Sequence, residues 1–553
     1  MILYFRKGWI IMKTIYYNGD FITLENNISK EEMKLKNLEN ADENLNYVDS
    51  ILVENGIIRQ VGKQKEILKN ADSETKLIDL EGMTMMPSFI DAHSHFSAVV
   101  NEFLQASLKQ TSSVKEIQDK LVKYKLNNNI NDGEWIIANG YDHNNLEENR
   151  HITKSEIDEV LPNNPVVITH QSGHSGIFNS EALKQLGINE NTIAPEGGKI
   201  EKINGKLTGY LEENAYIQYI KKAPMPDIMQ IREAVRKAEK KYASYGITTV
   251  QEGFFPKELI YIYQDIVNNK LVDIDLVGYA DKNIYEDIKQ QFYKNIKEYY
   301  NNLKINGIKI FLDGSPQSRT AWMREPYIDD DKYYGYGTMK DEEVEEAVKF
   351  ALTENIQILA HCNGDRACQQ YIDTISKFGE NAKKIRPVLI HGQFLAEDQI
   401  EETKKLGIIP SFFVAHTYYW GDVHIKNFGI DRANKISPLA SSLKNDLLFT
   451  LHQDSPVIES NMLETIWCAT TRETKSGKIL GQEERIGVLD TIKAVTINAA
   501  YQYFEENLKG SIKEGKIADL VILDKNPLNV EKDEIKDIKV VETIKSGKTI
   551  FKL

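Results

Sequence analysis

The sequence is poor in cysteine and has no surplus of positive charge. Only 3 cysteines occur among 553 residues, and none lies in a Cys-x-x-Cys pair. This argues against a disulfide scaffold and favours the cytoplasm as the protein's location. Acidic residues (82) outnumber Lys and Arg (68), giving a formal net charge of -14. Because nucleic-acid binding requires positive charge to neutralise phosphates, we expect no nucleic-acid partner.

Long apolar runs are also missing. No stretch approaches the roughly 18 consecutive apolar residues of a membrane-spanning helix, so we expect no membrane partner. Residues 1–21 are apolar in patches, but Arg6 and Lys7 interrupt them and no small-residue cleavage site follows, unlike a secretory signal. A strand-turn-strand pattern begins at Met12, and the sequence leaves open whether residues 1–11 belong to the native chain.

Short β-like runs separated by glycine turns occupy both ends of the chain. Residues 12–86 contain two Asn-Gly turns between apolar runs, and residues 505–553 have a similar pattern. Residues 25–46 are polar and charged, and we interpret them as a solvated loop. We expect residues 12–86 and 505–553 to form one small composite β-sandwich module.

Strand-like and helix-like segments alternate over residues 87–504. Apolar runs such as "NGIKIFLDG" and "PVLIHGQ" are separated by charged segments of helical period such as "DEEVEEAVKFALTEN". Such alternation predicts an α/β fold of parallel β/α units, most commonly a (β/α)8 TIM-type barrel. An open doubly wound sheet is the competing architecture, but neither GxGxxG nor a P-loop motif is present for its usual nucleotide-binding form. Residues 101–224 are too long for one connection and are predicted to be an inserted α+β subdomain.

The segment "PSFIDAHSHF", Pro87 to Phe96, ends a short apolar run with His93 and His95. Side chains at positions i and i+2 of a strand project to the same side, so the two imidazoles face one point. A borderline metal such as zinc binds in this way. Because His-x-His is a short pattern that also occurs at ordinary strand ends, the pair alone does not decide the matter.

Four further strand-like runs carry polar residues at or near their ends: Lys309, His361, His391 and Asp454. In a β/α barrel, the C-terminal ends of the strands converge on one face, where active sites form. A single histidine at a strand end is often structural, but chance would have to repeat at independent strands. The sequence therefore predicts that these side chains meet at one rim of the barrel.

Ten motifs in preserved order resemble the amidohydrolase superfamily, most closely its branch with the N-substituted formamide deformylases. They include "PSFIDAHSH", "SGHSGIFNSEAL", "KIFLDGSPQSRTA", "AHCNGDRA", "LHQDSPV" and "GSIKEGKIADLVILD". The resemblance extends from about Met12 to the end of the chain. It implies metal ligands for Zn²⁺ (one or two ions, with other divalent metals open): His93, His95, Lys309, His361, His391 and Asp454.

The resemblance also implies that Lys309 is carboxylated and bridges two ions, and that Asp454 contacts the reacting water. An unmodified lysine is a poor metal ligand, so the alternative is that Lys309 pairs with a nearby acid such as Asp313. Metal-activated water would attack a non-peptide C–N amide bond, with Asp454 as general base and then acid.

The implied partner is a small-molecule amide, namely an N-substituted formamide or related amide with an apolar substituent. Alternatives are hydrolysis of a cyclic amide or amino-acid derivative, or a non-catalytic metal-binding regulatory relative. The sequence leaves open whether the protein forms a homodimer. Candidate substrate-binding residues are His174, Arg319, His416, Tyr418, Tyr419 and Trp420.

These substrate candidates rest on local patterns with open alternatives. Residues 412–424, "FFVAHTYYWGDVH", would wall an apolar pocket as a loop after a strand, or pack as core under the rim. His174 occupies a Gly-flanked turn that is substrate-facing or structural. Arg319 contacts an anion or carbonyl, or ties its loop to Glu252. We expect Asp365 and Arg366 to orient His361; His143 is assigned no role.

Overall fold

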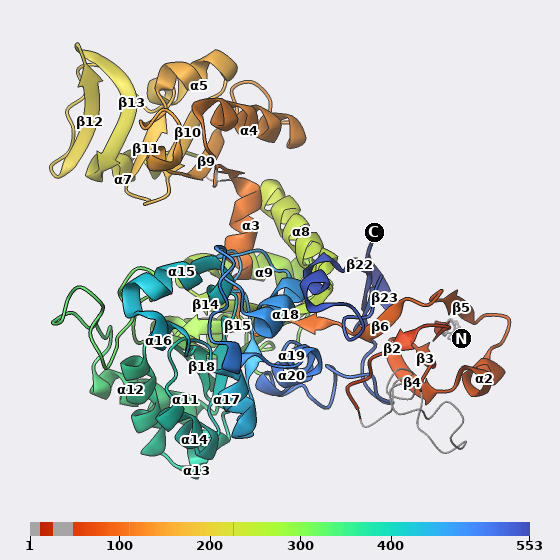
Figure 1. The fold of residues 1–553 in the computed structure, drawn as a ribbon. Coiled ribbons are helices and arrows are strands. Elements are labelled where there is room, and N and C mark those ends of the chain that lie inside the picture. Colours follow the sequence, from red (N-terminus) through yellow and green to blue (C-terminus); the bar gives the residue numbers. More distant parts are fainter. Residues whose placement is uncertain (1–11, 26–47, 110, 225) are drawn as a thin grey trace. The chain divides into compact units, whose positions relative to one another are not determined.

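A computed structural model describes residues 12–25, 48–109, 111–224 and 226–553 (Figure 1). Residues 1–11, whose place in the native chain the sequence left open, and most of the predicted loop 25–46 lie outside the described residues. The chain divides into two compact units, one of residues 1–97 with 239–553 and one of residues 98–238. Within the described ranges, no helix is both long and apolar enough to cross a membrane.

The first unit contains a sheet of eight parallel strands. In spatial order these are β7 (Phe89–Ile90), β14 (Ile247–Phe255), β15 (Asp275–Asp281), β16 (Leu303–Phe311), β17 (Gln357–Cys362), β18 (Val388–His391), β19 (Ile409–Phe412) and β20 (Thr450–Leu451). The segments that follow the edge strands β7 and β20 are joined by two hydrogen bonds: His95 N donates to Ser455 O (2.8 Å), and Asp454 N donates to His93 O (3.3 Å). The predicted TIM-type barrel is confirmed.

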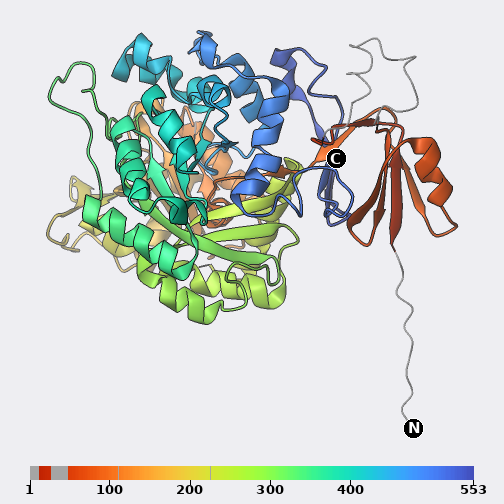
Figure 2. The same ribbon diagram turned by 90° about the horizontal axis from the view of Figure 1, so that it is seen from below.

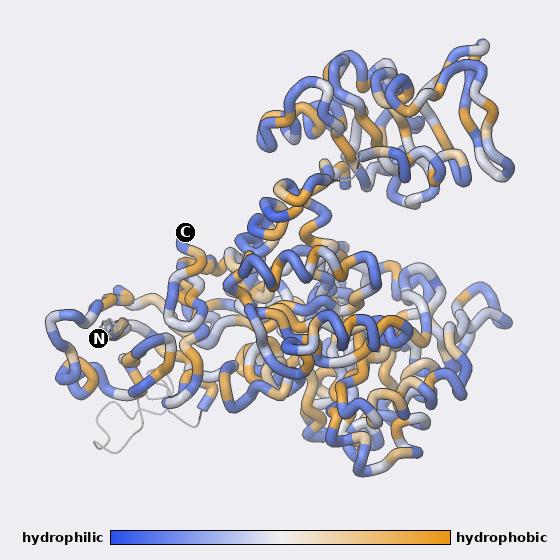
Figure 3. Tube along the Cα trace, turned by 180° about the vertical axis from the view of Figure 1, so that it is seen from behind, coloured by the Kyte–Doolittle hydropathy of each residue, from blue (hydrophilic) through white to orange (hydrophobic). Residues whose placement is uncertain are grey.

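Helices follow the barrel strands and cover the outside of the sheet (Figure 2). They are α9 (Ile260–Asn269), α10 (Tyr285–Gln291), α11 (Asp341–Glu354), α12 (Asp365–Ser376), α14 (Glu397–Lys405), α15 (His416–Phe428), α17 (Leu439–Lys444), α18 (Met462–Thr471), α19 (Val488–Ala494) and α20 (Ile497–Gln502). In Figure 3, hydrophilic and hydrophobic segments alternate along the helices, as expected for amphipathic helices.

Helix α11 shows how the local sequence sets these elements. Its first turn is acidic, and the Glu343 carboxylate accepts a hydrogen bond from Lys340 N at 2.7 Å. The negative charges interact favourably with the positive end of the helix dipole. Its buried residues recur at helical spacing: Val344, Ala347, Val348 and Ala351. The helix ends at Glu354, and the next residue, Asn355, adopts the left-handed conformation (φ 52°) common at helix C-termini.

Both chain ends contribute to a β-sandwich in the first unit. One sheet has the order β4 (Ile57–Gly62), β3 (Ser50–Glu54), β1 (Lys13–Tyr17) and β5 (Lys76–Asp79). The other has the order β2 (Asp20–Phe21), β6 (Thr84–Pro87), β21 (Leu520–Leu523), β22 (Val540–Lys545) and β23 (Lys548–Lys552). Their shared core includes Ile51, Met85 and Ile544, all fully buried. The predicted domain boundaries stay predictions.

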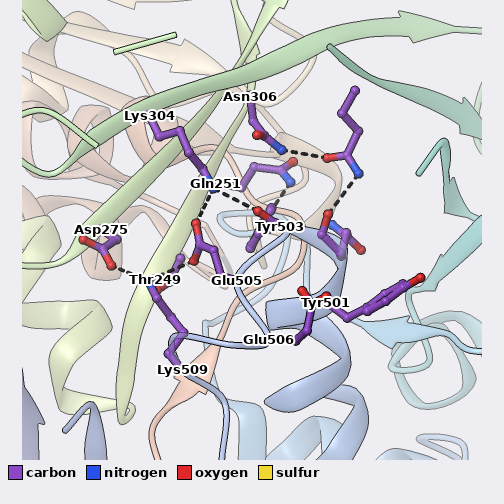
Figure 4. Close-up of polar contacts among 12 residues, drawn as sticks. Thr249, Gln251, Asp275, Lys304, Asn306, Tyr501, Tyr503, Glu505, Glu506 and Lys509 are labelled. Carbon is purple, nitrogen blue, oxygen red and sulfur yellow. Dashed lines mark hydrogen bonds and ion pairs between the residues drawn. The ribbon is translucent and has the colours of Figure 1, made fainter. Parts of the chain in front are cut away.

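A buried charge cluster joins the C-terminal segment to the barrel strands β15 and β16 (Figure 4). It contains three cations and three anions: Lys304, Lys509, Lys545, Asp275, Glu505 and Asp519. Lys545 Nζ lies 2.5 Å from Asp275 and 2.7 Å from Asp519, while Lys304 pairs with Glu505. Mutual pairing is what makes buried charges tolerable, because an unpaired charge in the interior is costly.

The second unit is an α+β fold built on a six-stranded mixed sheet. In spatial order the strands are β12 (Gly198–Ile203), β13 (Lys206–Glu213), β11 (Ser175–Phe178), β10 (Val166–His170), β9 (Ile136–Tyr141) and β8 (Ala106–Ser107). Its helices include α4 (Val114–Asn127), α5 (Lys154–Val160), α6 (Ser180–Gln185) and α7 (Asn214–Ile220). Strands β8, β9 and β10 are parallel, and β11 to β13 run antiparallel to their neighbours.

Candidate metal centre

The carboxyl ends of five barrel strands bring together the six predicted ligand residues. His93 and His95 follow β7, Lys309 is near the end of β16, and Asp454 follows β20. His361 is the penultimate residue of β17, and His391 is the last residue of β18. Asp454 Oδ1 lies 3.6 Å from His93 Nε2 and 3.4 Å from His95 Nε2. Asp454 Oδ2 lies 3.9 Å from His391 Nε2. Ligand atoms of His93, His391 and Asp454 are mutually close enough to share one ion.

Asp454 has the character of an ion ligand. Its Oδ1 is buried and makes no hydrogen bond within the described residues, although three imidazoles surround the carboxylate. Burial opposes ionisation, but His95, His93 and His391 hold the pKa of Asp454 well below its usual value. A buried anionic oxygen without a donor is costly unless a cation satisfies it. The donor set therefore fits a divalent ion.

Backbone strain is concentrated at the same place. Asp454 (φ 54°) and His391 (φ 74°) both adopt left-handed backbone conformations that L-residues rarely occupy. Such conformations cost about 1–3 kcal/mol each and persist where surrounding contacts impose them, often at functional sites. At this site, both residues direct their side chains towards His93.

Lys309 is buried beside His93 rather than paired with an acid. The residue is 3% exposed, and its Nζ lies 3.5 Å from His93 Nε2. Burial lowers the pKa of Lys309 to about 7. Asp313, the alternative partner, instead accepts hydrogen bonds from Trp322 N at 3.0 Å and Gly364 N at 2.7 Å.

Gln251, in β14, fixes the ring of His93. The amide nitrogen of Gln251 donates to Ala92 O (2.8 Å) and to Tyr503 Oη (2.9 Å; Figure 4). Its oxygen is therefore left to accept a hydrogen bond from His93 Nδ1, at 2.6 Å. The proton is thus held on Nδ1, and the lone pair on Nε2 faces Asp454 and Lys309.

Two of the other imidazoles, those of His361 and His391, also have orienting partners. His361 Nδ1 lies 3.2 Å from Asp313 Oδ1, and His391 Nδ1 lies 3.2 Å from His452 Nε2. His452 in turn contacts Ser411 Oγ at 2.8 Å. The expectation that Asp365 and Arg366 orient His361 is wrong: Asp365 accepts from Arg324 N (2.8 Å), and the Arg366 guanidinium lies over Trp322.

Sequence reasoning missed Gln251, Asp313 and His452 in these orienting roles. A signal existed for His452, because it precedes Asp454 by two residues in the run "LLFTLHQDSPV". Gln251 lies 158 residues from His93 in the sequence, and only the pairing of β14 with β7 brings them together.

The aromatic segment after β19 is a helix rather than a loop, because α15 begins at His416. His416 is buried, with its Nδ1 3.1 Å from His424 Nε2 and its ring 4.6 Å from that of Trp420. Tyr419 Oη donates to Glu464 at 2.9 Å, and Tyr418 packs against Trp467. The segment thus combines a buried start with partly exposed rings.

The remaining two substrate candidates have local partners. Arg319 donates from Nη2 to Ile328 O at 3.2 Å and lies over the Tyr327 ring. Glu252, its suggested partner, instead accepts from Ser97 N and Tyr263 Oη. His174 belongs to the second unit, where its side chain is 65% exposed and its Nδ1 lies 3.1 Å from Glu213 Oε2.

Residues 76–551 match the sequence profile of the Amidohydrolase family. The chain belongs to the amidohydrolase family. This confirms the resemblance seen in the motifs. The amidohydrolase is 30% identical over 531 residues to Protein LONG AFTER FAR-RED 3 of Arabidopsis thaliana, covering 92% of this chain and 90% of that protein.

Two further likenesses agree with this assignment. The N-substituted formamide deformylase of Arthrobacter pascens is 26% identical over 531 residues, covering 92% of the amidohydrolase and 96% of that protein. Among solved structures, an uncharacterized metal-dependent hydrolase from Pyrococcus horikoshii OT3 superposes with a TM-score of 0.73 at 20% identity. That likeness covers 94% of this chain and 99% of the other, and it shows the same fold.

Proposed function

We propose that this amidohydrolase is a metal-dependent hydrolase that cleaves a non-peptide C–N amide bond with activated water. The observation that supports this best is the Asp454 carboxylate, whose buried Oδ1 has no hydrogen-bond partner in the described chain while imidazole nitrogens lie 3.4 and 3.6 Å away. Imidazole and carboxylate together suit Zn²⁺, although other divalent metals use the same ligands. One or two ions would be held by His93, His95, Lys309, His361, His391 and Asp454.

Individual side chains have separate roles in the proposed reaction. When bound, a divalent ion supplies Lewis acidity and makes water nucleophilic at neutral pH. Asp454 accepts the proton of the attacking water and passes it to the leaving amine nitrogen, so that the amide yields an amine and a carboxylic acid. Gln251 holds His93 in the ligating tautomer, and the buried surroundings strengthen each electrostatic contact.

Lys309 is proposed to be carboxylated on Nζ. The buried amine has a pKa of about 7, so a large fraction is neutral near neutral pH and nucleophilic towards carbon dioxide. The N–C bond forms as the amine loses one proton, and the product is an anionic oxygen ligand. Growth on ¹³C-bicarbonate should give a carbamate carbon signal that is lost in Lys309→Met; its absence in the parent protein contradicts this assignment.

The proposed substrate is an N-substituted formamide, or a related amide, with an apolar substituent. Two observations support it: the relative from Arthrobacter pascens is named for this activity, and aromatic rings lie next to the barrel on α15. We keep His416, Tyr418, Tyr419 and Trp420 as candidate walls for the apolar group. Arg319 and His174 stay candidates for polar contacts, and a cytoplasmic location and a homodimer stay predictions.

The test combines metal analysis with release of formate from a panel of N-alkyl and N-aryl formamides. We expect Asp454→Asn to keep bound metal and lose turnover, because the amide can ligate but cannot accept the proton. Asp446→Asn is a matched control, since the Asp446 side chain is 89% exposed. Metal-loaded parent protein that hydrolyses none of the amides would contradict the proposed function, as would near-normal turnover in Asp454→Asn.

A further inference from the structure

The second unit carries a separate cluster of ligand-type side chains: Asp142, His143 and His170. Strands β9 and β10 are parallel neighbours, and a register shift between Thr169 and His170 places His170 opposite Tyr141. His170 ends β10, and Asp142 and His143 directly follow β9, so the three side chains emerge at the same edge of the sheet. One ligand atom from each lies within 4.8 Å of the others.

The three atoms form a nearly regular triangle. His143 Nδ1 lies 3.3 Å from His170 Nε2, while Asp142 Oδ1 lies 3.4 Å from His170 Nε2 and 3.7 Å from His143 Nδ1. Tetrahedral zinc with bonds of about 2.0–2.1 Å separates its ligand atoms by about 3.3–3.4 Å. Two edges of the triangle match one face of a zinc coordination tetrahedron, and the third, between His143 Nδ1 and Asp142 Oδ1, is somewhat longer at 3.7 Å.

Neighbouring groups hold the Asp142 carboxylate in place. Its Oδ1 accepts hydrogen bonds from Asn144 N (3.0 Å) and Asn144 Nδ2 (2.9 Å), and its Oδ2 accepts from Gln171 Nε2. Within the described ranges of the chain, no lysine or arginine forms an ion pair with Asp142. Its negative charge faces two imidazoles instead, which is the arrangement that a divalent ion would neutralise.

The two imidazoles also have supporting contacts. His170 Nδ1 lies 2.9 Å from Ser172 Oγ, which can accept a hydrogen bond from Nδ1–H while Nε2 faces the cluster. The backbone N–H of Ser172 also points at Nδ1 (3.1 Å), so the metal-free ring has two available tautomers and ion binding would select one. The His143 ring packs on that of His151, with ring centroids 4.0 Å apart.

We propose that Asp142, His143 and His170 form a second metal site for one borderline divalent ion of the Zn²⁺, Ni²⁺ or Cu²⁺ class. Two imidazoles and one carboxylate provide three protein ligands, which leaves one position for water. The side chain of His143 is 31% exposed, whereas those of Asp142 and His170 are 12% and 11% exposed, so an ion can enter from the His143 side. The ion would cross-link the ends of β9 and β10. This site goes beyond the proposed function and does not depend on it.

The competing explanation is a metal-free His143–His170 hydrogen bond beside an ionised Asp142. Zinc binding to the full chain separates the two, measured by equilibrium dialysis and metal analysis. We expect the double variant His143→Gln/His170→Gln to bind one equivalent less than the parent. His174→Gln is the matched control in the same unit, and it should lose none because its exposed ring lies beside Glu213 and is not part of the cluster.

A variant of the barrel site allows the zinc bound at each of the two sites to be measured separately. We expect His93→Gln/His391→Gln to lose the barrel metal and keep the equivalent at Asp142. An unchanged zinc count in the His143→Gln/His170→Gln protein would overturn the second site, and so would a barrel variant that binds no metal. Both readouts are independent of hydrolysis, so failure of the proposed function leaves them intact.

Two further variants guard against a failure of the double variant to fold. His170→Cys keeps a ligand but replaces nitrogen by sulfur, and we expect cobalt loading to produce a thiolate-to-cobalt absorption band that the parent lacks. Ser172→Ala removes the acceptor for His170 Nδ1, which should weaken zinc binding about 10- to 100-fold. A folded His170→Cys protein without the new band would contradict the proposal.

Discussion

Replacing Gln251 by leucine isolates the contribution of one hydrogen bond to the barrel metal centre. Leucine has a similar volume but no acceptor, so His93 Nδ1 loses its partner at 2.6 Å. The ring can then rotate or change tautomer, and its Nε2 no longer faces the centre in a fixed orientation. Loss of such an outer partner typically weakens metal affinity about 10- to 100-fold, which corresponds to ~1.4–2.7 kcal/mol.

The assay is competition for zinc between the full chain and a chromogenic chelator. Gln264→Leu serves as the control, because Gln264 is a partly exposed residue on α9 whose amide nitrogen donates to Gln291 Oε1. Denaturation of the metal-free proteins separates a general loss of stability from a loss of affinity. Zinc affinity within twofold of the parent in folded Gln251→Leu would refute the argument that Gln251 sets the orientation of His93.

Two other predictions concern charge. Burial disfavours protonation of His95, but Asp454 and Glu252 raise its pKa to about 9, so an ion that binds His95 must displace a proton. Zinc affinity should therefore rise with pH up to about 9, and calorimetry in buffers of different ionisation enthalpy should show proton release. Affinity independent of pH between 7 and 9 would contradict this. Asp275→Asn should lower the free energy of unfolding by about 3–5 kcal/mol, because Lys509 and Lys545 lose their shared carboxylate. Burial raises the pKa of Asp275, but the two lysines lower it to about 2. The stability that the ionised carboxylate contributes is therefore complete above the usual carboxyl pKa and is lost as pH falls through about 2. Denaturation of Asp275→Asn at a series of pH values should lack this pH-dependent loss of stability.

The barrel and the convergence of the candidate ligand residues on one rim were predictable because their signals are local in the sequence. His93, His361 and His391 each follow an apolar run that ends in the barrel, so the shared architecture places them on one rim. The sandwich has local signals of the same kind: Asn55-Gly56 turns the hairpin of β3 and β4, whereas Asn18-Gly19 connects β1 to β2 in the other sheet. The metal ligation itself stays a prediction.

Partners that depend on the register between strands could not be predicted. Asp313 is only four residues from Lys309, which suggested an ion pair, but the pairing of Phe311 with His361 places the carboxylate beside the histidine instead. His143 and His170 lie 27 residues apart, and only the alignment of β9 with β10 brings their nitrogens within 3.3 Å. The helix at His416 was missed because its glycine and aromatic residues resemble a loop.

Anomalous diffraction at the zinc edge, from crystals of the full chain grown with zinc, tests the central claim most directly. The ligand geometry predicts a peak about 2.0–2.2 Å from both His93 Nε2 and an Asp454 carboxylate oxygen. A zinc-saturated crystal with no peak between these two side chains would contradict the account.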